Sequence, residues 1–339
     1  MFDLLVFIGR FQPFHKEHER ILRIALENSH NVLVLVGSAG NARSIRNPFN
    51  YQERKFMIES SAPFGRVHVE PLFDRTYDDA AWVNQVKRIV TEKAIQLNNT
   101  IPHLNLNGTG RVGIIGANKD SSSYYLSLFP QWESVIIPVE NKINATDIRK
   151  DFFEEIAITN VSPPVGKLML AFSESEVAEQ LRREYWHVDD YKAHWEAAPY
   201  PVKHLTVDAV VEFRRHVLLI ERKSFPGKGL LALPGGHLEM DERMIDGVLR
   251  ELREETTIEV PDEVLRKSIV ATQIFDDPQR STIGRVVTFG AHIRIPDNVR
   301  AASVIGADDA AKAMWVPIDE LREYNMYDDH FHIIKYFLA

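Results

Sequence analysis

The sequence lacks cysteine, long apolar runs and any excess of positive charge. Without cysteine among its 339 residues, the chain has no disulfides, zinc–thiolate sites, iron–sulfur clusters or thiol catalysis, and a cytoplasmic location is expected. No run approaches the ~20 apolar residues of a membrane span, and the apolar stretch at residues 4–8 is too short for a signal-peptide core. No GxxxxGKS or GxxxxGKT motif occurs, which excludes a Walker-type nucleotide site.

Negative charge is distributed unevenly along the chain. The net charge is −8, yet residues 1–160 carry 18 Lys and Arg against 18 Asp and Glu, whereas residues 161–339 carry 22 against 30. Neither half offers the basic field that binds a phosphate backbone, so we expect no nucleic-acid partner and no membrane partner. The acidic half suits a divalent metal ion better.

The pattern of apolar residues predicts an α/β chain with two differently built domains. In residues 1–157, short apolar runs alternate with amphipathic segments, as in a doubly wound parallel sheet of the Rossmann-like kind. The expected strands are 4–8, 32–36, 67–72, 112–115 and 135–139, and the expected helices are 16–28, 51–60, 80–96, 121–128 and 146–158. Ligands of such sheets bind at the carboxyl ends of the strands.

A helical connector is expected at residues 158–202, where Pro163 and Pro164 predict a helix break. Residues 203–339 show an α+β pattern instead, in which a tight turn at Arg214 and Arg215 joins the first two strands. The expected strands are 205–213, 217–220, 269–275 and 286–295, and the expected helices are 318–324 and 332–338, besides one at the acidic motif described below.

Two histidines follow the first expected strand, in the run GRFQPFHKEH at residues 9–18. His15 and His18 are three residues apart at the start of a helix, so both rings lie on one face, where the helix N-terminus favours anions. Gly9 permits close backbone approach, and Arg10 can clamp a phosphate. Such donors suit a triphosphate under attack. Two histidines at this spacing alone, however, are more typical of an ordinary surface turn.

The same run resembles the signature of the HxGH nucleotidyltransferases, and in particular the archaeal-type nicotinamide-mononucleotide (NMN) adenylyltransferases. Further matches, to the NPF loop at residues 46–49, the loop after the fourth strand and the second signature at residues 144–149, extend the resemblance over residues 1–157. It implies transfer of the adenylyl group of ATP to NMN with Mg²⁺ on the phosphates, and transition-state stabilisation by His15, His18 and Arg149. The residues that it places at the nucleotides are Gly9, Arg10, Phe11, Asn47, Trp82, Gly116, Lys119, Asp120 and Thr146.

The chain departs from that family at two places. Glu17 stands where HxGH has glycine, and Asn144-Ala145 replace Ser-Gly of the second signature. Within that signature, the resemblance implies that Thr146 caps a helix and that Arg149 reaches the ATP phosphates. Trp82 matches the aromatic residue that stacks on the nicotinamide ring; apart from the resemblance, it is typical of a core tryptophan.

A spaced set of carboxylates marks the second domain. Glu251, Glu254 and Glu255 fall at i, i+3 and i+4, so they share one helix face and raise one another's pKa unless a cation neutralises them. Oxygen-only ligands suit Mg²⁺ or Mn²⁺ rather than zinc. Residues 236–259 carry 8 acidic and 3 basic side chains, so this segment holds most of the acid excess. Any one glutamate alone would be typical of a solvated helix face.

Gly236, Glu242 and the segment at residues 250–258 resemble the Nudix box, Gx5Ex7REUxEExGU, with Thr257 in place of its last glycine. Because glycine favours the left-handed turn needed there, we expect local strain or an altered cap. The resemblance implies metal-dependent diphosphate hydrolysis, with the Gly235 carbonyl and Asp308 as further candidate metal ligands. Residues 275–285 resemble ADP-ribose pyrophosphatases, which implies that Arg280 and Arg285 hold the ribose or the diphosphate.

The two resemblances together point to bifunctional enzymes of NAD metabolism that use ATP and NMN at one site and hydrolyse ADP-ribose to AMP and ribose 5-phosphate at the other. Two alternatives stay open. The Nudix domain could be a non-catalytic ADP-ribose sensor, against which its intact glutamates argue, or the two domains could use another acceptor and another nucleotide substrate. A homo-oligomer is compatible with the sequence, which does not determine the oligomeric state.

Overall fold

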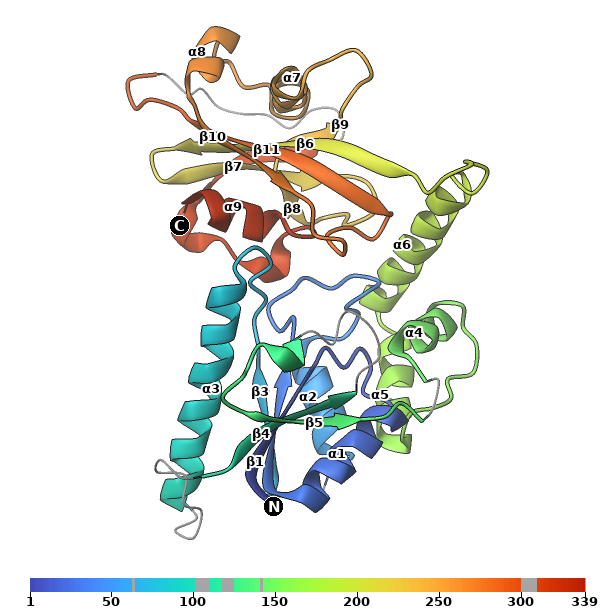
Figure 1. Cartoon of the computed structure of the whole chain (residues 1–339). Coiled ribbons are helices and arrows are strands. Elements are labelled where there is room, and N and C mark those ends of the chain that lie inside the picture. The colour runs from blue at the N-terminus through green and yellow to red at the C-terminus, as the bar shows by residue number, and fades with distance from the viewer. Residues whose placement is uncertain (63–64, 101–109, 118–124, 141–142, 300–309, 339) are drawn as a thin grey trace. The chain divides into compact units, whose positions relative to one another are not determined.

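The computed structural model describes residues 1–339 except 63–64, 101–109, 118–124, 141–142, 300–309 and 339 (Figure 1). The chain divides into two compact units, Met1–Arg182 and Arg183–Ala339, and the division falls within helix α6 (Glu176–Ala193). Each unit has its own sheet and is described by itself. Across the described ranges, every helix is too short or too polar to cross a membrane.

A five-stranded parallel sheet in the order β3-β2-β1-β4-β5 forms the centre of the first unit. Its strands are β1 (Phe2–Gly9), β2 (Ser29–Val36), β3 (Val67–Pro71), β4 (Val112–Ala117) and β5 (Glu133–Ile137). The other helices of this unit are α1 (Lys16–Asn28), α2 (Tyr51–Glu59), α3 (Asp79–Thr100), α4 (Ala145–Phe153) and α5 (Pro163–Ser173). This is the doubly wound sheet that the sequence predicts.

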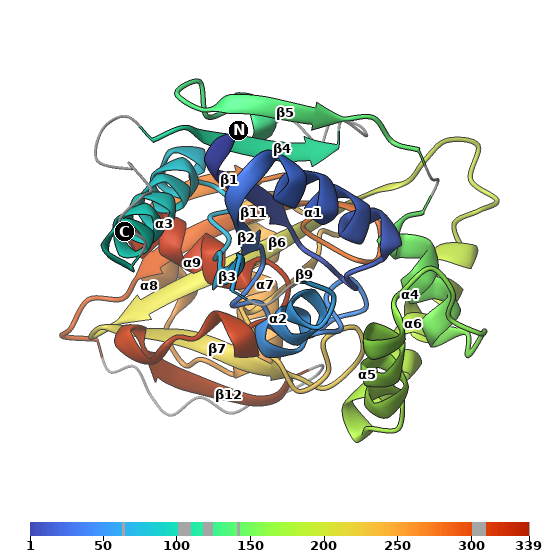
Figure 2. The ribbon, with the colours of Figure 1, turned by 90° about the horizontal axis from the view of Figure 1, so that it is seen from below.

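Helices cover both faces of this sheet, with α3 on one face and α1 and α2 on the other (Figures 1 and 2). Val86 and Val90 of α3 pack against Leu4 and Val6 of β1. Since neighbouring strand residues point to opposite faces, a strand covered on both sides must be apolar throughout, and residues 4–8 are all buried. This double burial explains why continuous apolar runs located the strands.

One helix prediction near the end of the first unit is wrong in its C-terminal bound. Helix α4 ends at Phe153 rather than residue 158, and Glu155 then adopts a left-handed φ of 57°. Pro163 and Pro164 do not merely break a helix, because they form the first turn of α5. Proline is tolerated there because the N–H groups of a first turn have no partner within the helix. The predicted helix 121–128 lies largely outside the described residues.

A seven-stranded mixed sheet forms the centre of the second unit, with the main path β10-β11-β6-β7-β12. Its strands are β6 (Lys203–Phe213), β7 (His216–Arg222), β8 (Leu231–Ala232), β9 (Gly235–His237), β10 (Ile269–Phe275), β11 (Arg285–Arg294) and β12 (Ala310–Pro317). Its helices are α7 (Met244–Thr256), α8 (Asp262–Lys267) and α9 (His330–Leu338). The α+β prediction is confirmed, although β12 was not foreseen and the predicted helix 318–324 is two short 3₁₀ turns, Ile318–Glu320 and Glu323–Asn325.

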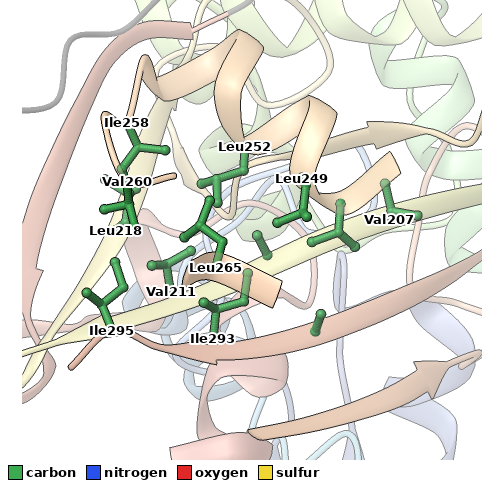
Figure 3. Packing of buried hydrophobic residues seen from close by; sticks show 13 residues of the cluster. Val207, Val211, Leu218, Leu249, Leu252, Ile258, Val260, Leu265, Ile293 and Ile295 are labelled. Carbon is green, nitrogen blue, oxygen red and sulfur yellow. The ribbon is translucent and has the colours of Figure 1, made fainter. Parts of the chain in front are cut away.

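Helices α7 and α8 lie on one face of the second sheet and α9 on the other (Figure 1). Leu249 and Leu252 point from α7 toward Val207 and Leu218 of the sheet (Figure 3). Burying these side chains fixes how α7 is rotated about its axis, at a gain of about 1.5–3 kcal/mol for each leucine. Glu254 is left on the exposed side of the helix.

The end of α7 carries the strain that Thr257 predicts. Thr257 adopts the left-handed conformation, with φ 48° and ψ 31°, and its N–H donates to the Arg253 carbonyl at 3.0 Å. A residue with a Cβ pays about 1–2 kcal/mol for this conformation. The helix therefore keeps its left-handed cap without the glycine that normally forms it.

We expect Thr257→Gly to raise the free energy of unfolding of the second unit by about 0.5–1 kcal/mol. The relief of strain is partly offset because glycine loses more freedom on folding. Urea denaturation followed by far-ultraviolet circular dichroism measures the change. Thr257→Ala is the matched control, since alanine keeps the Cβ, and an equal gain from alanine would show that the Cβ is not the source of strain.

Candidate active sites

A group of aromatic rings holds the histidine loop at the end of β1. Phe11 is buried with a left-handed φ of 52°, and a Cβ on Gly9 would come within 2.8 Å of its ring. The ring of Phe11 contacts His18 edge-on with centroids 5.0 Å apart, and Phe14 stacks on His18 at 5.6 Å. Gly9 and Phe11, expected at the nucleotide, thus also orient His18.

His15 and His18 lie together at the first turn of α1, as their spacing predicts. Their rings stack with centroids 3.6 Å apart and planes 17° apart. The backbone N–H of His15 donates to Nδ1 of His18 at 3.3 Å. Because Nδ1 is the acceptor, Nε2 of a neutral His18 carries the proton and is a donor.

Glu17, which stands where the family has glycine, is fully buried and turned toward Arg20. The two side chains form an ion pair of 2.6 Å between Oε1 and Nη2. Arg20 also donates to the carbonyl of Pro138 at 2.6 Å. The hydrogen bond to Glu17 raises the pKa of Arg20. Glu17 therefore connects the first turn of α1 to the segment that follows β5.

Three arginines come together near the carboxyl end of the sheet. Burial, with the charges of Arg10 and Arg46 nearby, lowers the pKa of Arg149 to about 10, so it stays charged at neutral pH. Arg149 donates to the Gln12 carbonyl at 2.7 Å and to Oγ1 of Thr146 at 3.2 Å. Mutually repelling cations of this kind would be stabilised by a polyphosphate.

Asn144 caps α4, and the prediction that Thr146 does so is wrong. The side-chain oxygen of Asn144 accepts the N–H of Asp147 at 2.9 Å. Asparagine is among the best N-cap residues, so it can take over the capping role of the family's serine. Thr146 lies two residues further on, in the first turn of α4, and contacts Arg149 instead.

Two of the remaining nucleotide-binding candidates have well-defined surroundings. Asn47 has a buried side-chain oxygen without a hydrogen-bond partner among the described residues, so this acceptor is available to a ligand. Trp82 is half-buried on α3 and packs on the core, with its ring 6.0 Å from that of Phe129. This packing matches the core role that its position on a helix favours.

Gly116 lies on β4 beneath Tyr125, whose hydroxyl would be 3.0 Å from a Cβ at residue 116. The same hydroxyl donates to the Ile8 carbonyl at 3.2 Å, and burial raises its pKa to about 12. Gly116 therefore allows Tyr125 to connect β4 with the end of β1. Lys119 and Asp120 lie outside the described residues.

In the second unit, Arg250 binds most of the acidic residues of the Nudix-like motif. Its guanidinium donates to Glu242 at 2.8 and 3.0 Å, to Glu251 at 2.8 Å and to Glu254 at 2.8 Å. These bonds raise the pKa of Arg250. A Cβ at Gly236 would come within 2.7 Å of the Glu251 carboxyl carbon, which explains why the motif begins with glycine.

Glu255 faces a different environment, since its Oε2 accepts the N–H of Gly235 at 2.8 Å. Burial, together with the nearby Glu251 carboxylate, raises its pKa to about 8. Burial also raises the pKa of Glu251. Glu251, Glu254 and Glu255 are spaced along one helix face as predicted, but Arg250 binds the first two and the Gly235 N–H binds the third. Within the described ranges, no three His, Asp or Glu side chains form a metal-binding cluster.

The donor set nevertheless fits a divalent cation. Glu251 and Glu255 supply only oxygen, which hard cations such as Mg²⁺ and Mn²⁺ prefer. Burial is the largest cause of the raised pKa of Glu255, and the positive charge of a metal ion beside the carboxylate would lower that pKa again. Gly235, whose carbonyl is a candidate ligand, lies next to Glu255. Asp308 lies outside the described residues.

The two arginines expected at the ADP-ribose have different surroundings. Arg280 is buried and binds Asp329 through two hydrogen bonds of 2.9 and 3.0 Å. Arg285 is partly exposed at the start of β11, where it donates to the Asp276 carbonyl at 2.6 Å. The structure therefore gives Arg280 a role in holding the fold and leaves Arg285 the more accessible of the two.

The sequence does not predict the roles of two further residues of these sites, Gln12 and Arg250. Gln12 holds Phe49 of the NPF loop through two hydrogen bonds, of 2.8 Å from its amide nitrogen and 3.0 Å to its amide oxygen. Arg250 belongs to the Nudix-like motif, but the resemblance alone gives no binding role to this arginine. Its position between acidic residues at i−8, i+1 and i+4 is the signal that indicates a shared cation.

The fold and the two motifs define the class of the protein: a nucleotidyltransferase-like domain followed by a Nudix domain. Family models match accordingly, "Cytidylyltransferase-like" over residues 6–105 and "NUDIX domain" over residues 202–337. The chain is similar to a nicotinamide/nicotinic acid mononucleotide adenylyltransferase of Acinetobacter baylyi, with 39% identity over 189 residues, 54% of this chain and 94% of the relative. It is also similar to an ADP-ribose pyrophosphatase of Methanocaldococcus jannaschii, with 34% identity over 131 residues, 39% of this chain and 70% of the relative.

Among solved structures, the chain is similar over its full length to a bifunctional NMN adenylyltransferase/ADP-ribose pyrophosphatase from Francisella tularensis, crystallised with AMP and a manganese ion. The TM-score is 0.90 at 34% identity, and the match covers 100% of this chain and 99% of that one. The chain belongs to this family of bifunctional NMN adenylyltransferases/ADP-ribose pyrophosphatases.

Proposed function

We propose that this protein is a two-site enzyme of NAD metabolism. The first unit transfers the adenylyl group of ATP to NMN, giving NAD and pyrophosphate, and the second unit hydrolyses ADP-ribose to AMP and ribose 5-phosphate. The observation that carries the proposal is the full-length match to a bifunctional enzyme, at a TM-score of 0.90. The paired histidines of one unit and the acidic motif of the other provide the corresponding chemistry.

In the adenylyl-transfer reaction, the NMN phosphate attacks the α-phosphorus of ATP in line with the departing pyrophosphate. We assign His15 and His18 as donors to the phosphate oxygens on which charge builds. Arg10 and Arg149 hold the triphosphate, and the mutual repulsion of these cations is relieved when it binds. The reaction needs positioning and charge stabilisation rather than a covalent intermediate.

In the hydrolysis of ADP-ribose, we assign Glu251, Glu254 and Glu255 as ligands of Mg²⁺ or Mn²⁺, with the Gly235 carbonyl as a further ligand. A bound divalent cation neutralises a diphosphate and activates water. Arg250 donates to one oxygen of Glu251 and to one oxygen of Glu254, so the other oxygen of each carboxylate would be the one to hold a metal ion. Glu242 stays with Arg250 through two hydrogen bonds and keeps the guanidinium beside the site.

Two assays on the whole chain test the proposal. NAD should form from ATP and NMN, and competition of NMN with nicotinate mononucleotide, phosphopantetheine and FMN identifies the preferred acceptor. ADP-ribose should yield AMP and ribose 5-phosphate only when Mg²⁺ or Mn²⁺ is added. Preference for another acceptor would contradict the first assignment, and binding of ADP-ribose without turnover would make the second unit a sensor.

A further inference from the structure

Arg54 of α2 is a buried arginine whose hydrogen-bond partners, among the described residues, are all backbone carbonyls. Its side chain is 1% exposed. Nη1 donates to the carbonyls of Arg10 at 2.7 Å and Gly37 at 2.6 Å, and Nη2 donates to that of Ser38 at 3.0 Å. Its Nε reaches the Asn50 carbonyl at 3.2 Å. One guanidinium thus connects the segments that follow β1 and β2 with the start of α2.

These segments lie where ligands of a doubly wound sheet bind, at the carboxyl ends of adjacent strands. Arg10 is assigned to the ATP phosphates, and Gly37 donates its N–H to the Gly9 carbonyl at 2.9 Å. Ser38 adopts a left-handed φ of 50°, which a non-glycine residue keeps only when its surroundings hold it. The carbonyl contact of Arg54 is one such restraint, and the N–H of Ser38, which donates to Asp74 at 3.2 Å, is another.

The charge of Arg54 is also unusual for a buried group. Within the described ranges it forms no ion pair with a carboxylate. Burial lowers its pKa to about 10. The carboxylates of Asp74 and Glu53 oppose this shift and the charges of Arg10 and Arg43 add to it, and the group stays protonated at neutral pH. A buried cation that is held by carbonyl dipoles, with no carboxylate in an ion pair with it among the described residues, is costly, and an anion bound nearby would offset that cost.

We propose that Arg54 is a positioning residue of the adenylyl-transfer site, which fixes the backbone of Arg10 against that of Gly37 and Ser38 and adds positive charge beside the bound triphosphate. The inference rests on the proposed function of the first unit. It concerns the nucleoside triphosphate rather than the acceptor, because the contacts of Arg54 reach the Arg10 backbone.

The chain offers a matched control in Arg66. This arginine also binds three carbonyls, of Leu26 at 2.7 Å, Ser29 at 2.6 Å and His30 at 3.0 Å. Ser29 begins β2, so these contacts lie at the amino end of the strand, opposite the proposed site. Arg66→Lys therefore removes carbonyl contacts of the same kind without touching the triphosphate.

In the whole chain, we expect Arg54→Lys to lower kcat/KM for ATP by about 10- to 100-fold, as misplacement of binding groups by about 1 Å does. The inhibition constant of inorganic tripolyphosphate should rise by a similar factor, whereas KM for NMN should change less than about twofold. Arg54→Gln, which also removes the charge, should be worse than Arg54→Lys. Arg66→Lys should leave all these constants within about twofold, and ADP-ribose hydrolysis, catalysed by the other unit, should persist in every variant.

Equal effects of Arg54→Lys and Arg66→Lys would overturn the positioning role, as would equal loss of ATP and NMN affinity. Equal effects of Arg54→Lys and Arg54→Gln would overturn the contribution of charge. If Arg54→Lys fails to fold, hydrogen exchange of the Gly37 and Ser38 amides in the wild type, measured with and without tripolyphosphate, provides the second readout. Exchange should slow when tripolyphosphate binds, because Arg54 holds the carbonyls of these residues beside the proposed site, and unchanged exchange would refute the inference. Absence of NAD formation by the wild type would instead refute the proposed function.

Discussion

His18→Ala is expected to slow NAD formation by about 10²- to 10³-fold, the usual cost of removing one preplaced donor from a charge-stabilising site. In a neutral His18, Nε2 carries the proton because Nδ1 accepts the N–H of His15. Rates of NAD formation from saturating ATP and NMN measure the effect. Hydrolysis of ADP-ribose by the same preparation should remain at the wild-type rate.

His30→Ala is the matched control for this prediction, since His30 is an exposed histidine of the same unit at the other end of the sheet. Its substitution should leave both activities unchanged. Loss of both activities in a His18→Ala protein that is still folded would contradict the assignment of separate sites. A His18→Ala protein with normal NAD formation would remove His18 from the mechanism.

Glu255→Gln should reverse this pattern, with at least about a 100-fold loss of ADP-ribose hydrolysis and normal NAD formation. Loss of a direct metal ligand should cost more than the 10- to 100-fold typical of groups that only orient a ligand. Glutamine is nearly isosteric and can still accept the N–H of Gly235, so the fold should be retained. Glu263→Gln on α8, where Glu263 is exposed and pairs with Lys267, is the control. Equal activity of the two variants would exclude Glu255 as a ligand.

Because the pKa of Glu255 is raised, Glu255→Gln should also change how Mn²⁺ affinity and stability depend on pH. At a pKa of about 8, a proton competes with the metal ion at neutral pH, so Mn²⁺ should bind more tightly as pH rises to about 8 and level off above. Without metal, the native state holds an extra proton between the unfolded pKa of about 4.3 and about 8, so stability should fall as pH rises through that window. Glu255→Gln should abolish both trends. Their persistence would assign them to another group.

The sequence predicts two kinds of element correctly: strands that are buried on both faces of the sheet, and helices with apolar residues spaced along one face. The strand at residues 4–8 and helix Lys16–Asn28 are found where predicted, because burial dictates their patterns directly. The stacking of His15 on His18 follows from their spacing in the same way. Short-range geometry is therefore readable from the chain alone.

Contacts between distant segments were not readable in this way. No pattern in the sequence indicates that Arg280 forms a buried pair with Asp329, 49 residues further along the chain. Arg54 carries no signal in the sequence, because its partners are carbonyls that every residue possesses. The spacing of the glutamates predicts a metal ion as their cation, and it does not indicate that Arg250 binds the same carboxylates. Such roles depend on which loops the fold brings together.

Helix α6 determines where this chain can be cut. Its Glu184 is buried and accepts the N–H of Gly227 at 2.9 Å, and Tyr191 lies 3.4 Å from His204 through their side-chain polar atoms. A fragment that starts at residue 203, where the sequence places the Nudix domain, would leave the Gly227 amide without its acceptor, at a cost of about 1–3 kcal/mol. The same helix pairs Arg182 with Glu155 of the first unit. A cut on either side of α6 removes contacts of this helix from one of the two fragments. Point substitutions therefore separate the two activities more cleanly than truncation does.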